Sequence, residues 1–102
     1  MSNSREKLFA LDHPAARGHF PGNPIIPGAV LLDEVLQAVT EGSDLAQTGA
    51  GCEIRSAKFL RPVRPGDSML IRWSVLSNGD TKFECLLQGQ PALTGALRLG
   101  SR

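Results

Sequence analysis

Hydrophobic residues follow a helical spacing in one part of the chain and an alternating spacing in others. From Ala29 to Glu41 they recur three and four positions apart, and no glycine or proline interrupts the segment. This pattern predicts one helix of thirteen residues, about 20 Å long at ~1.5 Å per residue, which is enough to lie across a small sheet. Its apolar positions are Val30, Leu31, Val35, Leu36 and Val39.

Alternating apolar and polar residues predict strands before and after this helix. A short strand is expected at Lys7–Leu11, with Phe9 and Leu11 on one face, and Pro14 ends it. Later strands are expected at residues 54–60 and 69–75 and in the two runs lined by Phe83, Cys85 and Leu87 and by Leu93, Leu97 and Leu99.

Turn residues separate the later strands. Asn78-Gly79 favours a hairpin after residue 75, because this dipeptide accepts the positive φ angles of tight turns. Gly89–Pro91 is expected to break the next strand, and Gly95 marks either a bulge or a close approach of the helix. One helix and a meander of antiparallel strands predict an α+β fold in which the sheet wraps around the helix.

Length and composition narrow the class of protein. The 102 residues, 41% of them hydrophobic, describe a single domain over residues 1–102, and a subunit interface would add burial that a chain of this size can use. The net charge of +1 gives no reason to expect nucleic acid binding. No segment approaches the ~20 apolar residues of a membrane span, and the polar N-terminus lacks a signal-peptide core, so we expect a cytoplasmic protein.

The segment that precedes the predicted helix carries the candidate chemistry. Residues 18–28 read GHFPGNPIIPG, in which three prolines and the interspersed glycines specify one contorted backbone path. His19 lies at one end of this loop, and Asp33 follows it fourteen residues later on the helix. A proton acceptor and a proton donor are the minimum equipment for an elimination or addition next to a carbonyl, so the pair predicts an acid/base site.

These motifs resemble those of one enzyme family. HFPGNPIIPG runs straight into a helix, Asp33 and Gln37 lie one turn apart on that helix, and residues 58–67 read KFLRPVRPGD. In this respect the chain resembles the β-hydroxyacyl-[acyl carrier protein] dehydratases of the FabA/FabZ type over residues 18–67, and beyond Asp67 only the strand pattern agrees. The resemblance implies a hot-dog fold, in which an antiparallel sheet wraps one central helix. It also implies a homodimer or other oligomer whose active sites combine His19 of one subunit with Asp33 of the other.

The resemblance also implies a role for each matching residue in dehydrating a 3-hydroxyacyl thioester to the trans-2-enoyl product. The backbone amide of Gly28 would polarise the thioester carbonyl, His19 would remove the α-proton, and Asp33 would protonate the leaving hydroxyl directly or through a water. Asp33 and the adjacent Glu34 point about 100° apart on a helix, so we expect Glu34 to be solvated. Further substrate contacts are expected from Phe20, Pro27, Gln37 and Phe59. Gln37 either holds the Asp33 carboxyl by a hydrogen bond or fills a polar gap.

Basic residues gather in and after the predicted strand at residues 54–60. They are Arg55, Lys58, Arg61 and Arg64. These residues are either a docking patch for the acidic acyl carrier protein that holds the substrate, or ordinary solvated strand charge. His13 precedes Pro14 outside the motif and is expected to have no catalytic role.

Cofactor sites are not expected. The chain has neither a phosphate-binding glycine loop nor a cysteine/histidine ligand cluster, so we expect no nucleotide cofactor and no metal. Cys52 and Cys85 lack zinc-ligand spacing and are expected to be free thiols.

The substrate and the activity leave alternatives open. The short segment before His19 resembles compact dehydratases of aryl polyene and polyketide-like pathways, so the substrate belongs either to fatty-acid synthesis or to such a pathway. Relatives that also isomerise the product double bond carry aspartate where this chain has Asp33, but one carboxylate does not establish that activity. A hot-dog acyl thioesterase and a non-catalytic acyl-binding or partner subunit are the other two candidate functions.

Overall fold

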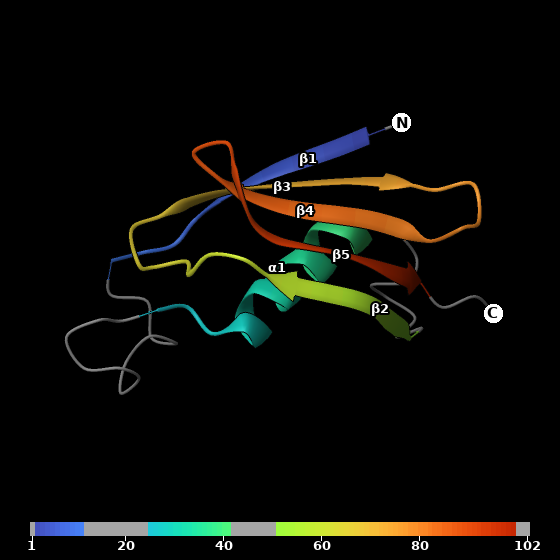
Figure 1. Ribbon diagram of the computed structural model, residues 1–102, viewed down its shortest axis with the longest axis horizontal. Helices are drawn as coiled ribbons and strands as arrows, with labels where there is room; N and C mark the ends of the chain where they lie inside the picture. The colour runs from blue at the N-terminus through green and yellow to red at the C-terminus, as the bar shows by residue number, and fades with distance from the viewer. Residues whose placement is uncertain (1, 12–24, 42–50, 100–102) are drawn as a thin grey trace.

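The computed structural model describes residues 2–11, 25–41 and 51–99 of the chain (Figure 1). The elements are, in chain order, β1 (Ser2–Leu8), α1 (Gly28–Thr40), β2 (Cys52–Phe59), β3 (Ser68–Val75), β4 (Thr81–Leu87) and β5 (Gln90–Leu99). The predicted helix is confirmed, and it begins one residue earlier than expected. Each of the four predicted later strands is present.

The strands form one antiparallel sheet in the order β1-β3-β4-β5-β2. β1 and β2 are therefore its two edges, although they are first and second in the chain. The helix packs on one face of this sheet, which confirms the predicted α+β architecture of a sheet around one central helix (Figure 1). Among the described residues no helix has the length and apolar character needed to cross a bilayer.

The core lies between α1 and the helix-facing side of the sheet. Leu31, Val35 and Ala38 point from α1 into this space because they recur at three- and four-residue intervals. Every second residue of the central strands meets them, because side chains alternate between the two faces of a strand. These strand residues are Met69, Ile71, Phe83, Cys85, Leu93 and Leu97.

The prediction for the first strand was wrong in its position. β1 covers Ser2–Leu8 instead of Lys7–Leu11, and Leu11, expected to share a buried face with Phe9, is 83% exposed. β1 is an edge strand that pairs with β3 from Ser2 opposite Ser74 to Leu8 opposite Ser68. β1 is therefore held in the sheet by its backbone pairing with β3 and does not need an apolar face. Because its sequence is polar, it lacks the alternating pattern from which a strand is predicted.

The two tight connections differ in how well the sequence predicted them. Between β3 and β4 the expected hairpin is present, and Gly79 takes the positive φ (92°) while Asn78 does not. Between β4 and β5 the turn residues are Gln88 and Gly89, with φ of 50° and 80°, as in a two-residue turn of the primed type. β5 therefore starts at Gln90 and includes Pro91, which was predicted to lie in the break.

Gly95 marks a close approach between strands. One of the two predicted alternatives for this residue was a close approach of the helix, but the atoms nearest to it belong to neighbouring strands. A Cβ added here would overlap the backbone carbonyl of Ser56 on β2 and lie 2.7 Å from the ring of Phe83 on β4. A bulge lies close by on β2, where Ile54 faces Leu97 and Ser56 faces Ala96, so Arg55 is an extra residue.

Candidate active site

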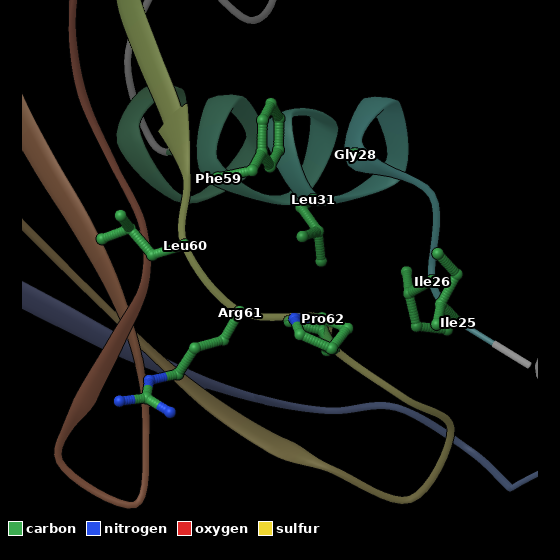
Figure 2. A pocket seen from close by; sticks show the side chains of 9 residues that line it. Ile25, Ile26, Gly28, Leu31, Phe59, Leu60, Arg61 and Pro62 are labelled. Atoms are coloured by element: carbon green, nitrogen blue, oxygen red, sulfur yellow. The ribbon is translucent and has the colours of Figure 1, made fainter. Parts of the chain in front are cut away.

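An apolar cavity of about 500 Å³ opens where the chain enters α1 (Figure 2). One wall is the start of α1 and the two residues before the helix's capping proline, and the other is the segment that leaves β2. The first wall consists of Ile25, Ile26, Gly28 and Leu31, and the second of Phe59, Leu60, Arg61, Pro62 and Val63. The volume suits a small acyl group, and apart from Arg61 every lining side chain is apolar.

Backbone hydrogen bonds hold the two walls in place. The Ile26 amide donates to the Val63 carbonyl at 2.7 Å, which joins one wall to the other. The Leu60 amide donates to the Ala92 carbonyl of β5 at 2.8 Å. The cavity is therefore built on backbone contacts to the sheet and helix, and such support keeps a binding site rigid.

Gly28 is the first residue of α1 and lies directly against the ring of Phe59 (Figure 2). A Cβ added at Gly28 would lie 2.9 Å from Cε1 and Cζ of that ring. Any other residue at this position would therefore displace Phe59, whose side chain is 51% exposed at the mouth of the cavity. Glycine lets the start of the helix and this ring form one continuous wall.

The helix begins without a side-chain cap. Pro27 occupies the capping position, and its carbonyl accepts the amides of Val30 and Leu31. The amides of Gly28 and Ala29 precede the first intrahelical bond and carry the positive end of the helix dipole. An acyl carbonyl oxygen or an oxyanion is the kind of group that such amides bind.

Asp33 lies on α1 but does not line this cavity. Its side chain is exposed and accepts a hydrogen bond from Nε2 of Gln37 at 2.8 Å. The first of the two alternatives for Gln37 is thus the one present in the structure. Glu34 was expected to be solvated, but it pairs with Lys7 of β1 at 3.5 Å and its side chain is only 18% exposed. Pairing to the edge strand accounts for this difference.

The four basic residues of the candidate docking patch lie at different places along and after β2. Arg55 pairs with Glu53 at 3.2 Å and with Asp80 at 3.6 Å, and so belongs to a charge cluster beside the β3–β4 hairpin. Lys58 faces away from the helix opposite Thr94. Arg61 lies at the cavity, and its guanidinium extends away from Gly28 and Leu31 to donate to Gln90 at 3.3 Å (Figure 2). Arg64 is exposed in the loop after β2.

Some residues of the cavity were not singled out from the sequence. Leu31 is the main one, because it was predicted only as an apolar position of the helix and not as part of a site. Helical phase was the available signal, since Leu31 follows Gly28 by three positions and so shares its face. Phe59 was predicted as a substrate contact and lies in the cavity wall. His19 and Phe20, like His13, lie outside the described residues.

The cysteines and acidic residues provide no alternative centre in the described part of the chain. Cys52 and Cys85 are both free, as predicted. Burial raises the pKa of the Cys85 thiol to about 12, so this residue is not available as a nucleophile at neutral pH. No group of three or more potential metal ligands occurs among the described residues.

One antiparallel sheet around one helix, with an acyl-sized apolar cavity at the helix N-terminus, defines a protein of the hot-dog class. Comparison with solved structures agrees: the dehydratase heterocomplex ApeI:P from Xenorhabdus doucetiae superimposes with a TM-score of 0.82 over 98% of this chain and 88% of the other, at 24% identity. A 1,4-dihydroxy-2-naphthoyl-CoA thioesterase from Synechocystis shares the fold at a TM-score of 0.68 and 14% identity, over 98% and 81% of the two chains. The fold alone therefore does not separate dehydratases from thioesterases.

Sequence comparison separates them. The family model for ApeI-like proteins, described as ApeI dehydratase, matches residues 4–96. The 3-hydroxyacyl-[acyl-carrier-protein] dehydratase FabZ of Ehrlichia canis is 32% identical over 103 aligned positions, which cover 91% of this chain and 70% of that protein. The chain thus belongs to the ApeI-like family of dehydratases related to FabZ, which confirms the predicted family and enzyme class.

Proposed function

We propose that this protein dehydrates a 3-hydroxyacyl group carried as a thioester on acyl carrier protein to the trans-2-enoyl thioester. The observation that carries the proposal is the apolar cavity that ends on Gly28 at the N-terminus of α1, in a chain of the dehydratase family. An acyl thioester in this cavity can bring its carbonyl oxygen to free helix amides. The nearby helix dipole then stabilises the negative charge that develops on this oxygen.

Three residues perform the elimination in this proposal. The Gly28 amide holds the thioester oxygen, and His19 as the neutral imidazole takes the proton from the α-carbon. The electron pair of that C–H bond forms the α,β double bond, while the bond from the β-carbon to its hydroxyl breaks. Asp33, directly or through a water, supplies the proton that lets the hydroxyl leave as water.

The position of Asp33 supports an active site shared between two subunits. Asp33 is exposed and lies outside the cavity that Gly28 lines, so a single subunit does not bring the two together. In a homodimer, Asp33 of the partner subunit would face the cavity of the first. The Gln37 hydrogen bond would then fix the orientation of this carboxyl group, and Gln37 would stand beside the substrate.

The other predicted residues are assigned to contacts with the acyl group and with the carrier protein. Phe59 borders the acyl group in this proposal, together with Phe20 of the preceding loop. Pro27, predicted as a further contact, caps the helix beside the cavity and is not among its lining residues. Lys58, Arg61 and Arg64 receive the acidic carrier protein, whereas Arg55 is already paired with Glu53 and Asp80. A place in fatty-acid or polyene and polyketide-like synthesis, and a cytoplasmic location, stay predictions from the sequence.

The test follows formation of the double bond by ultraviolet absorbance with a series of 3-hydroxyacyl thioesters, in both the dehydration and hydration directions. We expect the wild-type protein to convert at least one member of the series. His19→Ala and Asp33→Asn should each lower kcat by at least about 100-fold, the usual contribution of a general acid or base. Circular dichroism checks that both variants remain folded.

Three outcomes would contradict the proposal. Release of free thiol without a double bond would favour a hot-dog thioesterase, and full activity of His19→Ala would exclude that residue as the base. Lys82→Glu is the control for surface change, because this residue is exposed on β4 away from the cavity. An inactive wild-type protein that still binds acylated carrier protein would favour the non-catalytic partner subunit.

A further inference from the structure

The apolar cavity at the start of α1 has walls that differ in burial from one part to another. Three lining side chains, those of Ile26, Leu31 and Val63, are each at most 3% exposed. Two others, Phe59 and Leu60, are 51% and 45% exposed. The cavity therefore has an open mouth beside the end of β2 and a closed inner end formed by the three buried side chains.

The inner end belongs to the core of the molecule. Ile26, Leu31 and Val63 are all members of the hydrophobic cluster between α1 and the sheet. The Ile26 amide donates to the Val63 carbonyl at 2.7 Å, and the Leu31 amide donates to the Pro27 carbonyl at 3.3 Å. Side chains packed to the density of a protein interior do not move aside for a ligand as exposed side chains at a mouth can. The inner end therefore limits the depth of the cavity.

Leu31 is the inner-end residue that lies in line with Gly28. It follows Gly28 by three positions, so both residues lie on the same side of α1, about 4.5 Å apart along the axis at ~1.5 Å per residue. Figure 2 shows the Leu31 side chain projecting from the helix toward Pro62 in the opposite wall. An acyl group whose carbonyl oxygen binds the Gly28 amide therefore meets Leu31 within a few carbon atoms of the reacting centre.

Polarity determines which end of the substrate enters the cavity. Among the described residues that line it, Arg61 alone is charged, and its guanidinium extends away from Gly28 and Leu31 to Gln90 (Figure 2). The inner end offers only hydrocarbon side chains, and a polar group buried there would lose its hydrogen bonds to water. The acyl tail therefore points inward, while the thioester and its carrier stay on the side of the mouth.

We propose that Leu31 sets the longest acyl tail that the cavity accepts, so that the protein acts on short-chain 3-hydroxyacyl thioesters in preference to long ones. The inference rests on the proposed function, since it takes the thioester carbonyl to bind at Gly28. A longer tail must displace the Leu31 side chain or turn back to the mouth, where it loses contact with the apolar walls. Truncating Leu31 opens space that is continuous with the cavity, because a core relaxes only partly around a deleted side chain.

Chain-length profiles of Leu31 variants test this proposal. kcat/KM is measured for 3-hydroxyacyl groups from butanoyl to dodecanoyl, all on the same small thiol so that carrier docking does not contribute. The wild-type protein should favour the short members. Leu31→Ala should raise the ratio of kcat/KM for long over short substrates at least about tenfold, as expected for methylene groups in a hydrophobic pocket. Leu31→Val removes less of the side chain and should shift the same ratio by less.

Leu97→Ala is the matched control, because it makes the same truncation at a fully buried core residue of β5 that does not line the cavity. It should lower stability and leave the ratio at its wild-type value. Circular dichroism shows which variants are folded, and Leu31→Val decides alone if Leu31→Ala is not. Equal conversion of long and short substrates by the wild-type protein, an unchanged ratio in the folded Leu31 variants, or the same shift in Leu97→Ala would each overturn the proposal.

Binding of acyl thioesters that lack the 3-hydroxyl group separates this inference from the proposed function. Such compounds cannot be dehydrated, and isothermal titration calorimetry measures their affinity for the same proteins. If affinity for the wild-type protein falls with chain length and Leu31→Ala restores it, while no substrate is dehydrated, only the proposed function is contradicted. If the wild-type protein binds all chain lengths equally, the role of Leu31 is contradicted even when dehydration is observed.

Discussion

At the scale of single residues, the contact between Gly28 and Phe59 connects the fold to the chemistry. The ring lies where a Cβ of residue 28 would be, so the glycine is required by space and not by a positive φ. Gly28 itself lines the cavity at the start of α1. A side chain at this position would therefore alter the site before it altered the helix.

Gly28→Ala should separate the effect of a side chain on the site from its effect on the stability of the helix. Alanine suits a helix better than glycine by up to ~1 kcal/mol, and the half-exposed Phe59 ring can move aside, so the free energy of unfolding should change by no more than about 1 kcal/mol. kcat/KM should fall at least about tenfold, because the new methyl group and the displaced ring both enter the cavity mouth. Urea denaturation and the absorbance assay measure the two quantities.

A double variant provides the control for this substitution. Phe59→Leu removes the ring that the new methyl group meets. Adding Gly28→Ala to Phe59→Leu should therefore lower kcat/KM by less than adding Gly28→Ala to the wild-type protein does. An unchanged kcat/KM in Gly28→Ala would mean that the cavity mouth beside Gly28 is not where the acyl group reacts.

Among the candidate site residues, the relative placement of those whose spacing belongs to a motif was predictable from the sequence. Gly28, Asp33 and Gln37 have fixed intervals along one loop and one helix, so their relative placement follows from local geometry. The contact of Phe59 with Gly28 joins positions 31 residues apart and depends on how β2 meets α1. The pairing of Glu34 with Lys7 was missed for the same reason, because it depends on an edge strand whose polar sequence gave no alternating signal.

At the scale of elements, a buried carboxylate connects three strands at one end of the sheet. Asp80, just before β4, accepts a hydrogen bond from Nε of Arg98 on β5 at 2.6 Å and pairs with Arg55 on β2 at 3.6 Å. Its backbone amide also donates to the Asn78 side chain within the hairpin loop. Arg98, and to a smaller extent Arg55, hold the pKa of the Asp80 carboxyl below its usual range.

This cluster predicts how stability depends on pH. A carboxyl group whose folded pKa is lowered stabilises the fold above its unfolded pKa of ~3.9, and the contribution is lost as pH falls through the folded pKa. Asp80→Asn should therefore lower the free energy of unfolding at pH 7. Between pH 4 and pH 2 the free energy of unfolding of this variant should fall by less than that of the wild-type protein. Urea denaturation at a series of pH values measures both. Glu6→Gln, at an exposed position of β1, is the control, and an acid dependence unchanged by Asp80→Asn would contradict the assignment.

Element boundaries were predictable where periodicity is strong. α1 and the central strands combine a regular apolar spacing with burial against one core, so their ends were found to within about two residues. The bulge at Arg55 and the turn at Gln88-Gly89 were not predicted from the sequence, because each is imposed by the register between neighbouring strands. Gln88 adopts a positive φ although it is not a glycine, which no local sequence rule predicts.

At the scale of the whole molecule, charge is distributed unevenly even though the net charge is only +1. Many basic side chains already have carboxylate partners: Arg5 pairs with Glu41, Arg72 with Glu84, and Arg98 with Asp80. Lys58 and Arg61 form no ion pair with a described residue, and Arg61 lies at the cavity. Local positive charge beside the cavity, and not net charge, is thus what an acidic carrier protein would meet.

This distribution predicts a salt dependence that is specific to the carrier protein. KM for a substrate on acyl carrier protein should rise with ionic strength, because exposed charges are screened beyond ~10 Å at 0.1 M salt. KM for the same acyl group on a small uncharged thiol should not change. Arg61→Ala should raise KM for the carrier-bound substrate about two- to fivefold, as expected for one exposed charge pair, and leave kcat for the small thioester near its wild-type value.

Arg5→Ala removes the same charge from β1 at the opposite edge of the sheet and is the matched control for Arg61→Ala. Because β1 and β2 are separated by three strands, this variant should leave KM for both substrates unchanged. If salt raised KM equally for the carrier-bound and the small thioester, the effect would lie in the acyl cavity or in the dimer, and not in docking. If Arg5→Ala and Arg61→Ala had equal effects, the carrier protein would be responding to overall charge, and the residues that follow β2 would have no special role in receiving it.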